Sequence, residues 1–117
     1  MKLENYVLGN WIKGDGEGQP LYNAVNGQII ANATTKGLDF ASILDYGRQK
    51  GSTALRKMTF QERGRMLKAL ALHLLEKKEI FYPISYKTGA TRADSWIDIE
   101  GGIGNLFRSE EHTSERV

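Results

Sequence analysis

The chain has 117 residues, enough for one domain, and its hydrophobic content of 40% and charged content of 26% are ordinary for a globular protein. A formal net charge of +2 is too small to indicate nucleic-acid binding, and no apolar run is long enough to span a membrane. Cysteine is absent, which excludes disulfides, thiolate metal sites and a thiol nucleophile; with no signal-peptide pattern at the N-terminus, a cytoplasmic location is expected.

The first third of the chain predicts short strands. Residues 6–8 and 11–13 flank the turn pair Gly9-Asn10, which predicts a small hairpin. Residues 21–23 and 28–34 flank Asn26-Gly27, a dipeptide typical of tight turns, and predict a second strand pair. Alternation along residues 28–34 is typical of a partly exposed edge strand.

A glycine-rich segment, GDGEGQP, lies between these two pairs at residues 14–20. A phosphate-binding loop needs a strand before it and the N-terminus of a helix after it. Here Pro20 and another strand follow, and both residues between the glycines are acidic, which repels phosphate. The context therefore favours a plain surface loop.

A first helix is predicted after Gly37. Asp39 is placed to cap it, and apolar residues follow at the i, i+3, i+4, i+7 spacing as far as Gly47. Gly51 is expected to end this helix, and residues 52–58 to form a connector with one helical turn. Asp39 is thus interpreted as a cap and not as a catalytic acid.

The strongest helical pattern runs from Thr59 to Lys78. Thr59 and Glu62 have the spacing of a capping box. One face is apolar and is expected to be buried, and it consists of Met66, Leu67, Leu70, Ala71 and Leu74. Leu72 interrupts the polar arc, which indicates a second covered surface.

Two more helices are predicted beyond a break near residues 77–78. Pro83 is tolerated only in a first turn, so the new helix is expected to begin close to it. Residues 88–91 form a stop, and residues 92–107 place Trp96, Ile99, Ile103 and Phe107 at helical spacing on a buried stripe. Gly101, Gly102 and Gly104 weaken this helix, which predicts close packing where a Cβ would not fit.

Few residues are candidates for chemistry. His73 is a lone histidine on the polar side of its helix, without a second ligand or a nucleophile, and is interpreted as a surface residue. Asp94 and Asp98 share a helix face, with Glu100 close by, and could hold a hard cation; solvated charge is the preferred interpretation. Trp96 fits a buried stripe as well as a ligand-stacking role.

Several segments resemble the N-terminal part of the aldehyde dehydrogenase superfamily. The segments that carry this likeness are Gly9-Asn10-Trp11, Asn23 to Gly27, Ile29-Ile30-Ala31 and Thr88-Gly89. A narrower likeness is to the bifunctional aldehyde dehydrogenases of phenylacetate degradation. It is carried by Gly37-Leu38-Asp39, Ala54-Leu55-Arg56, Met58 to Arg63, Met66 to Ala69 and the block Thr88 to Phe107. The chain departs from the wider superfamily at residues 23–27, which lack a proline, and at Ala90, where lysine is common.

The resemblance implies an α/β, aldehyde dehydrogenase-like fold for the parent protein, with this chain supplying short N-terminal β-strands followed by three to four α-helices. It implies oxidation of a coenzyme A-linked semialdehyde with NADP or NAD, and, in the bifunctional kind, a second domain that opens an oxepin ring by hydrolysis. The related coenzyme A-semialdehyde dehydrogenase of benzoate degradation is an alternative. The implied partners are the remainder of the dehydrogenase domain and a second copy in a homo-oligomer, with no nucleic acid and no membrane.

No catalytic, cofactor-binding or metal-binding residue is assigned to this chain. The family's cysteine nucleophile, glutamate base and cofactor loop correspond to positions beyond Phe107, so the chain alone is expected to be inactive and to bind no NADP or NAD. A non-enzymatic alternative is a small helical interaction module that docks through the Leu72 side.

The C-terminal residues differ from the rest. Residues 1–107 are interpreted as an N-terminal fragment of an aldehyde dehydrogenase domain, and residues 108–117 as a non-native tail that resembles a translated sequencing adapter. This tail is polar and has no apolar repeat, so disorder is expected from Ser109 onward.

Overall fold

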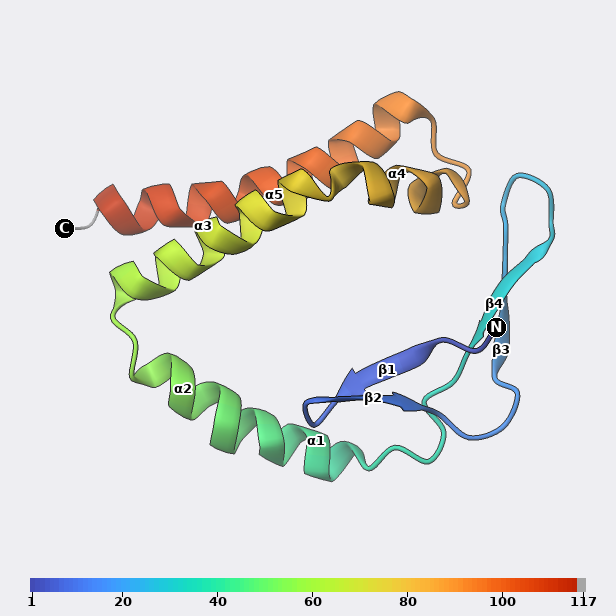
Figure 1. Cartoon of the computed structure of the whole chain (residues 1–117), viewed down its shortest axis with the longest axis horizontal. Coiled ribbons are helices and arrows are strands. Elements are labelled where there is room, and N and C mark those ends of the chain that lie inside the picture. The colour runs from blue at the N-terminus through green and yellow to red at the C-terminus, as the bar shows by residue number, and fades with distance from the viewer. Residues whose placement is uncertain (116–117) are drawn as a thin grey trace. The chain divides into compact units, whose positions relative to one another are not determined.

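A computed structural model describes the backbone of residues 1–115 and the side chains of residues 1–108. The chain divides into two compact units, Met1–Ala54 and Leu55–Val117. The strands are β1 (Glu4–Val7), β2 (Asn10–Lys13), β3 (Gln19–Tyr22) and β4 (Ile29–Ala33). The helices are α1 (Phe40–Tyr46), η1 (Gly47–Gly51), α2 (Ser52–Arg56), α3 (Phe60–Glu76), α4 (Lys78–Tyr86) and α5 (Arg92–Glu115). Figure 1 labels all of these elements except η1. Because α1, η1 and α2 follow one another without a gap, the strands are followed by four helical segments, as the sequence predicted.

The four strands form two antiparallel hairpins. In the first, Val7 pairs with Asn10, so the turn is Leu8-Gly9 and not the predicted Gly9-Asn10. Both turn residues have positive φ, 55° for Leu8 and 78° for Gly9. A two-residue hairpin needs this backbone twist at both positions, and glycine supplies it without steric cost at only one of them.

The second hairpin joins β3 to β4 through the predicted turn, where Gly27 has φ 74°. Strand β4 is a partly exposed strand of a two-stranded sheet, as the predicted edge strand requires, and it has one isolated bridge on its free side. That side meets the N-terminal segment, because the Leu3 N–H donates to the Asn32 carbonyl and the Asn32 N–H donates to the Met1 carbonyl, at 2.8 and 2.9 Å. Neighbours on both sides explain why Ala31 is buried in β4.

The sequence predicted that the helix after Asp39 ends at Gly51, but the helical run continues past this residue. The Asp39 side chain accepts from the Ser42 N–H at 3.2 Å and caps α1. Residues 47–51 then form a π-helical turn that leads directly into α2. The two glycines carry no side chain that would oppose the wider π-turn, so the backbone absorbs them without ending the helix.

Helix α3 begins with the predicted capping box. The Glu62 N–H donates to Thr59 Oγ1 at 3.1 Å, and the Thr59 N–H donates to Glu62 Oε1 at 3.2 Å. The buried face is shifted from the predicted one. It is centred on Gly64 and Ala71, whereas Met66 and Leu70 are exposed. Apolar residues surround most of this helix, so their spacing alone could not identify the arc that meets α5.

Helix α4 begins at Lys78, after the predicted break. Pro83 lies in its second turn and not in its first, which corrects the expected position. Proline at this point removes only the hydrogen bond to the carbonyl of Glu79, four residues back in the first turn. The cost is limited because this carbonyl lies near the helix end.

Helix α5 starts as predicted but continues past residue 107. Its backbone is helical to Glu115, so the expected disorder from Ser109 is wrong for residues 109–115, while residues 116–117 lie outside the described part. Extending an existing helix adds one hydrogen bond for each residue fixed, and Glu and Arg are good helix formers, which explains the continuation.

The glycines of α5 do not pack closely. A Cβ built on Gly101, Gly102 or Gly104 would have no heavy atom within 4 Å, apart from the helix's own backbone. Trp96 is likewise not part of a buried stripe, since it is 58% exposed. The arc of α5 that meets α3 and α4 contains Ser95 and Ile103, and the glycines at 101 and 104 lie on another arc.

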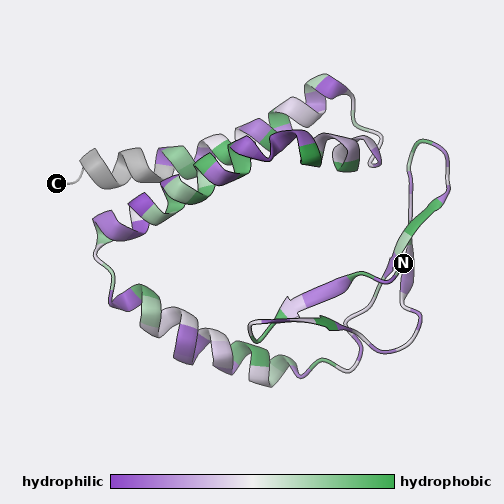
Figure 2. Ribbon diagram, in the orientation of Figure 1, coloured by the Kyte–Doolittle hydropathy of each residue, from purple (hydrophilic) through white to green (hydrophobic). Residues whose placement is uncertain are grey.

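The buried core is small. Among the described side chains, the buried apolar residues are Ala31, Ala71, Tyr82 and Ile103. Figure 2 shows apolar residues distributed along every helix with polar residues between them. Many large apolar side chains are exposed, among them Phe40, Leu44, Leu72, Ile80 and Ile97. No helix within the described residues combines the length and hydropathy needed to cross a bilayer.

Candidate functional site

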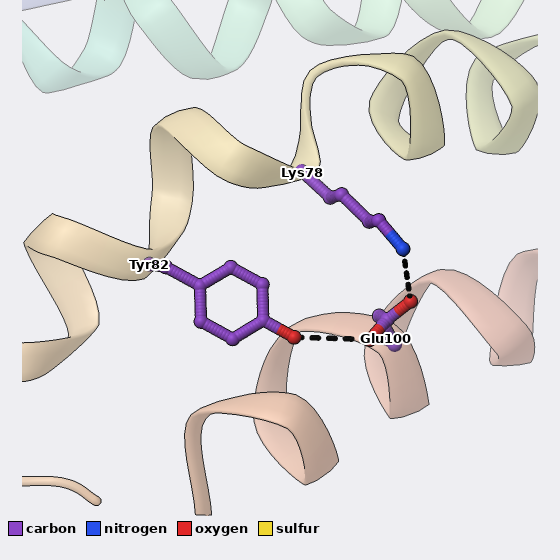
Figure 3. A network of polar contacts seen from close by, with 3 residues as sticks. All are labelled: Lys78, Tyr82 and Glu100. Carbon is purple, nitrogen blue, oxygen red and sulfur yellow. Dashed lines mark hydrogen bonds and ion pairs between the residues drawn. The ribbon is translucent and has the colours of Figure 1, made fainter. Parts of the chain in front are cut away.

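The most connected polar group in the second unit joins α4 to α5. Lys78 Nζ lies 2.9 Å from Glu100 Oε1, and the Tyr82 hydroxyl donates to Glu100 Oε2 at 2.9 Å (Figure 3). Both oxygens of one carboxylate are therefore used by two side chains of the neighbouring helix. We call Lys78, Tyr82 and Glu100 the α4–α5 polar cluster.

Local helix geometry produces this arrangement. Lys78 and Tyr82 are four residues apart in α4, so their side chains lie on one face of the helix. Arg92, at the start of α5, stacks over the Tyr82 ring at 4.9 Å and donates to the Tyr86 hydroxyl at 3.2 Å. A second contact between the same helices is the 2.8 Å hydrogen bond that joins the hydroxyls of Ser85 and buried Ser95.

The electrostatics favour a charged carboxylate and a neutral phenol. Hydrogen bonds from Lys78 and Tyr82 hold the pKa of the Glu100 carboxyl below its ordinary value. The hydrogen bond to Glu100 raises the pKa of Lys78. Burial, followed by the hydrogen bond to Glu100, raises the pKa of the Tyr82 phenol. These shifts stabilise the ion pair and oppose proton transfer within it.

This cluster is suited to bracing two helices and not to catalysis. Both oxygens of its carboxylate already accept from α4, and the raised pKa values of Lys78 and Tyr82 keep the amine and the hydroxyl protonated, so neither is activated as a nucleophile. Tyr82 is buried with its hydroxyl committed to Glu100. The cluster therefore fixes how α4 lies against α5.

An apolar groove lies beside the cluster in the same unit. It has a volume of about 440 Å³ and is formed by α4, α5 and the end of α3. Its lining is Leu74, Phe81, Ile84, Ser85, Thr88, Asp98, Ile99, Gly102, Ile103 and Leu106. With one carboxylate and two hydroxyls at its border, the groove can accept an apolar side chain but offers no set of converging polar groups that would orient a cofactor.

The candidates named from the sequence do not come together. His73 is exposed on α3. Asp94 lies in the first turn of α5, where its N–H donates to Thr91 Oγ1 at 3.1 Å, and Asp98 borders the groove. Glu100 forms no cluster with these two residues, because its carboxylate accepts from Lys78 and Tyr82 of α4. Within the residues that the structure describes, no group of three or more His, Cys, Asp or Glu side chains could hold a metal ion.

The glycine-rich loop at residues 14–18 presents carbonyl groups to the donors around it. Lys2 Nζ donates to the carbonyls of Gly14 and Gly16, at 2.8 and 2.6 Å, and the Thr34 hydroxyl donates to that of Asp15 at 3.1 Å. A phosphate cradle presents N–H groups instead. The loop is thus held as a structural turn against β4.

Sequence reasoning did not identify the α4–α5 polar cluster. Glu100 is close to Asp94 and Asp98 in sequence, whereas its actual partners lie 18 and 22 residues earlier. The signal available was the Lys78–Tyr82 spacing at i, i+4, which places a cation and a phenol on one face next to an incoming helix.

No protein-family model matches the chain. Over 104 residues it is 39% identical to the 3,4-dehydroadipyl-CoA semialdehyde dehydrogenase of Aromatoleum evansii. The match covers 88% of this chain and 20% of that protein, so the chain spans about a fifth of the length of the curated relative it matches. This partial homology supports the predicted relationship to aldehyde dehydrogenases at the level of the superfamily.

Proposed function

We propose that this chain is the N-terminal part of an NAD(P)-dependent dehydrogenase that oxidises a semialdehyde carried on coenzyme A. The observation that carries the proposal is the 39% identity over 88% of the chain to a coenzyme A-semialdehyde dehydrogenase. The small buried core and the many exposed apolar side chains support it, since such surfaces are ordinarily covered in a complete domain.

The role of the chain within such an enzyme is structural. Oxidation of an aldehyde by this family needs a cysteine thiolate to form the adduct from which hydride leaves, and the 117 residues contain no cysteine. NADP or NAD supplies the hydride acceptor when it is bound. The chain has no cysteine thiolate, and its described residues show no glycine loop of converging N–H groups, so we expect the rest of the protein to supply both.

Two substrates of the same chemical class are proposed, in order. A 3,4-dehydroadipyl-CoA-type semialdehyde is favoured by the relative's printed activity. The semialdehyde produced by oxepin-CoA ring opening in phenylacetate degradation, with a bifunctional enzyme, is the alternative favoured by the block Thr88–Phe107. In either case we propose a cytoplasmic homo-oligomer in which this chain packs on the remainder of its own domain.

One observation favours a second, non-enzymatic function. Leu72 is 49% exposed on α3, and Leu75 of the same helix is also exposed. A small helical module could use this surface to bind a partner protein. Unlike the first candidate function, this one does not require that the chain be part of a longer polypeptide.

The test is to amplify the gene from source DNA past codon 107 and to express the product. We expect a longer reading frame whose protein reduces NADP or NAD with a coenzyme A-linked semialdehyde, and reacts more weakly with the same aldehyde lacking coenzyme A. A natural stop after Val117, or a long product without this activity, would overturn the proposal. Titration of the 117-residue chain with NADP and NAD by calorimetry should give no saturable binding.

A further inference from the structure

The helix at residues 40–51 has an outer stripe that the described chain leaves uncovered. None of the residues of α1 or η1 is buried. Phe40 and Leu44 are large apolar side chains that are 62% and 56% exposed. Phe40, Leu44 and Gly47 follow at i, i+4 and i+7 and share one side of α1, and Gly51 ends the π-helical turn that begins at Gly47. We call these four residues the outer stripe.

A neighbouring side of the same helix is already in use. Ile43 and Tyr46 are half-buried, and a Cβ on Gly9 would lie 3.0 Å from the Tyr46 hydroxyl, which places this ring against the β1–β2 turn. The first hairpin therefore holds one side of the helix, and the outer stripe lies on a different side. The helix contacts its own unit on one side and exposes Phe40 and Leu44 on the adjacent side. This adjacent side is therefore available for a second apolar contact.

The glycines indicate what kind of surface the stripe would meet. A Cβ on Gly47 or Gly51 would have nothing within 4 Å, apart from the helix's own backbone, so neither glycine is required by a contact within the described chain. Glycine weakens a helix, and two glycines one turn apart let another backbone approach closely. A fluid lipid surface gains nothing from such an approach, whereas a packed protein surface does.

The net charge of residues 39–51 also favours a protein surface over a lipid surface as the partner of the outer stripe. Between residues 39 and 51 the acidic residues are Asp39 and Asp45 and the basic residues are Arg48 and Lys50, so the segment has no net charge. A helix that binds anionic membranes is typically rich in Lys and Arg on its polar face. This balance therefore favours a protein partner over a lipid surface.

We propose that the outer stripe is the face on which the part of the dehydrogenase that follows the fragment 1–107 packs. The inference rests on the proposed function, because the occupant is the polypeptide that the relative possesses over the four-fifths of its length not matched here. The occupant presents an apolar surface with small residues, or an exposed backbone, opposite Gly47 and Gly51.

The test compares backbone hydrogen exchange at residues 40–51 in this chain and in the longer product of the gene. We expect exchange in the longer protein to be slower by about tenfold or more, as burial of the stripe requires. Leu44→Asp should remove this protection. Thr53→Asp, an exposed position on the opposite side of the helical run, should retain it. In the 117-residue chain both variants should exchange at the parent's rate.

Each outcome separates the possibilities. An active longer enzyme in which residues 40–51 exchange as fast as in this chain would overturn the inference and leave the proposed function standing. Protection that depends on Leu44, in a longer protein without dehydrogenase activity, would support the docking face and overturn the function. The absence of any longer product, a dimer of the 117-residue chain that Leu44→Asp dissociates, or binding to anionic vesicles that the same variant abolishes would each overturn the inference.

Discussion

Each of the two units of this chain is stabilised internally by a different kind of contact. In Met1–Ala54 the organising contacts involve the backbone, and Ala31 is its buried apolar residue. Strand ladders, a parallel bridge from Lys2 to Asn32 and hydrogen bonds to the carbonyls of the 14–18 loop define its structure. At Gly14 and Gly18 a Cβ would meet the backbone of Thr34 and Ala33, respectively.

In Leu55–Val117 the organising contacts are between side chains. Ala71 of α3, Tyr82 of α4 and Ile103 of α5 are buried where the helices meet, and the α4–α5 polar cluster braces one end. The glycines of α5, in contrast, have open space above them. The comparison teaches that a side-chain truncation should matter in the second unit and a backbone change in the first.

The largest effect is expected from Ile103→Ala. Ile103 is 6% exposed where α5 meets the other helices, so its truncation leaves a cavity and should lower the free energy of unfolding by about 2–5 kcal/mol. Ile97→Ala is the matched control, because Ile97 lies on the same helix and is 63% exposed. Urea unfolding followed by far-UV circular dichroism measures both. Equal losses for the two variants would show that the buried arc of α5 is wrongly placed.

The next effect tests the backbone character of the first unit. Gly18 has φ 79°, and a Cβ there would lie 2.5 Å from the Ala33 carbonyl oxygen. Gly18→Ala should therefore destabilise the β3–β4 hairpin by about 2 kcal/mol or more, since positive φ alone costs about 1–2 kcal/mol.

Gly16→Ala separates the two causes. Gly16 has φ 76° but nothing within 4 Å of a Cβ, so this variant should lose only the part due to φ. Amide exchange in β3 and β4 measures the opening free energy for both. A Gly16→Ala effect as large as that of Gly18→Ala would mean that the close approach to Ala33 contributes nothing.

The elements with a local signal were predicted well from the sequence. The Thr59–Glu62 box, the Asp39 cap and the Asn26-Gly27 turn each depend on residues within four positions of one another. Element ends were predicted less well, because Gly51 and Ser109 are positions where the backbone can continue a helix at small cost. The predicted buried face of α3 was wrong at Met66 and Leu70. An apolar pattern does not show which side of a helix a neighbouring element covers.

The site could not be predicted for a different reason. The α4–α5 polar cluster depends on how two helices pack, and Glu100 carries no local sign of its partners. The resemblance to aldehyde dehydrogenases came from motifs and not from any constellation of reactive groups. The predicted close packing of the α5 glycines failed because nothing in the described chain approaches Gly101, Gly102 or Gly104.

A smaller effect should follow from Thr59→Ala. This change removes the hydroxyl that accepts from the Glu62 N–H and should lower the free energy of unfolding by about 1 kcal/mol. Thr53→Ala, at an exposed position where the structure shows no capping bond, serves as the control and should be neutral within about 0.5 kcal/mol. Thermal unfolding by circular dichroism resolves the pair. An unchanged midpoint for Thr59→Ala would show that water replaces the cap without loss.

The smallest effect concerns the pH dependence of the α4–α5 polar cluster. The pKa of Glu100 is lowered by Lys78 and Tyr82, so its contribution to stability is present above the ordinary carboxyl pKa of 4.5 and is lost as pH falls through the folded-state value. The pKa values of Lys78 and Tyr82 are raised, so their contributions are present at neutral pH and are lost as pH rises through the folded-state values above about 10.

Glu100→Gln tests the acid limb of this dependence. Glutamine can still accept from Tyr82 but carries no charge for Lys78, so the variant should be less stable than the parent at pH 7, and the difference should shrink as the pH is lowered from about 5 to 3. Asp98→Asn is the matched control on the same helix, because Asp98 takes no part in the cluster. Urea midpoints at several pH values provide the measurement. A difference between Glu100→Gln and the parent that stays constant across this range would mean that the ion pair contributes nothing to the packing of α4 on α5, and that the buried side chains alone distinguish the second unit from the first.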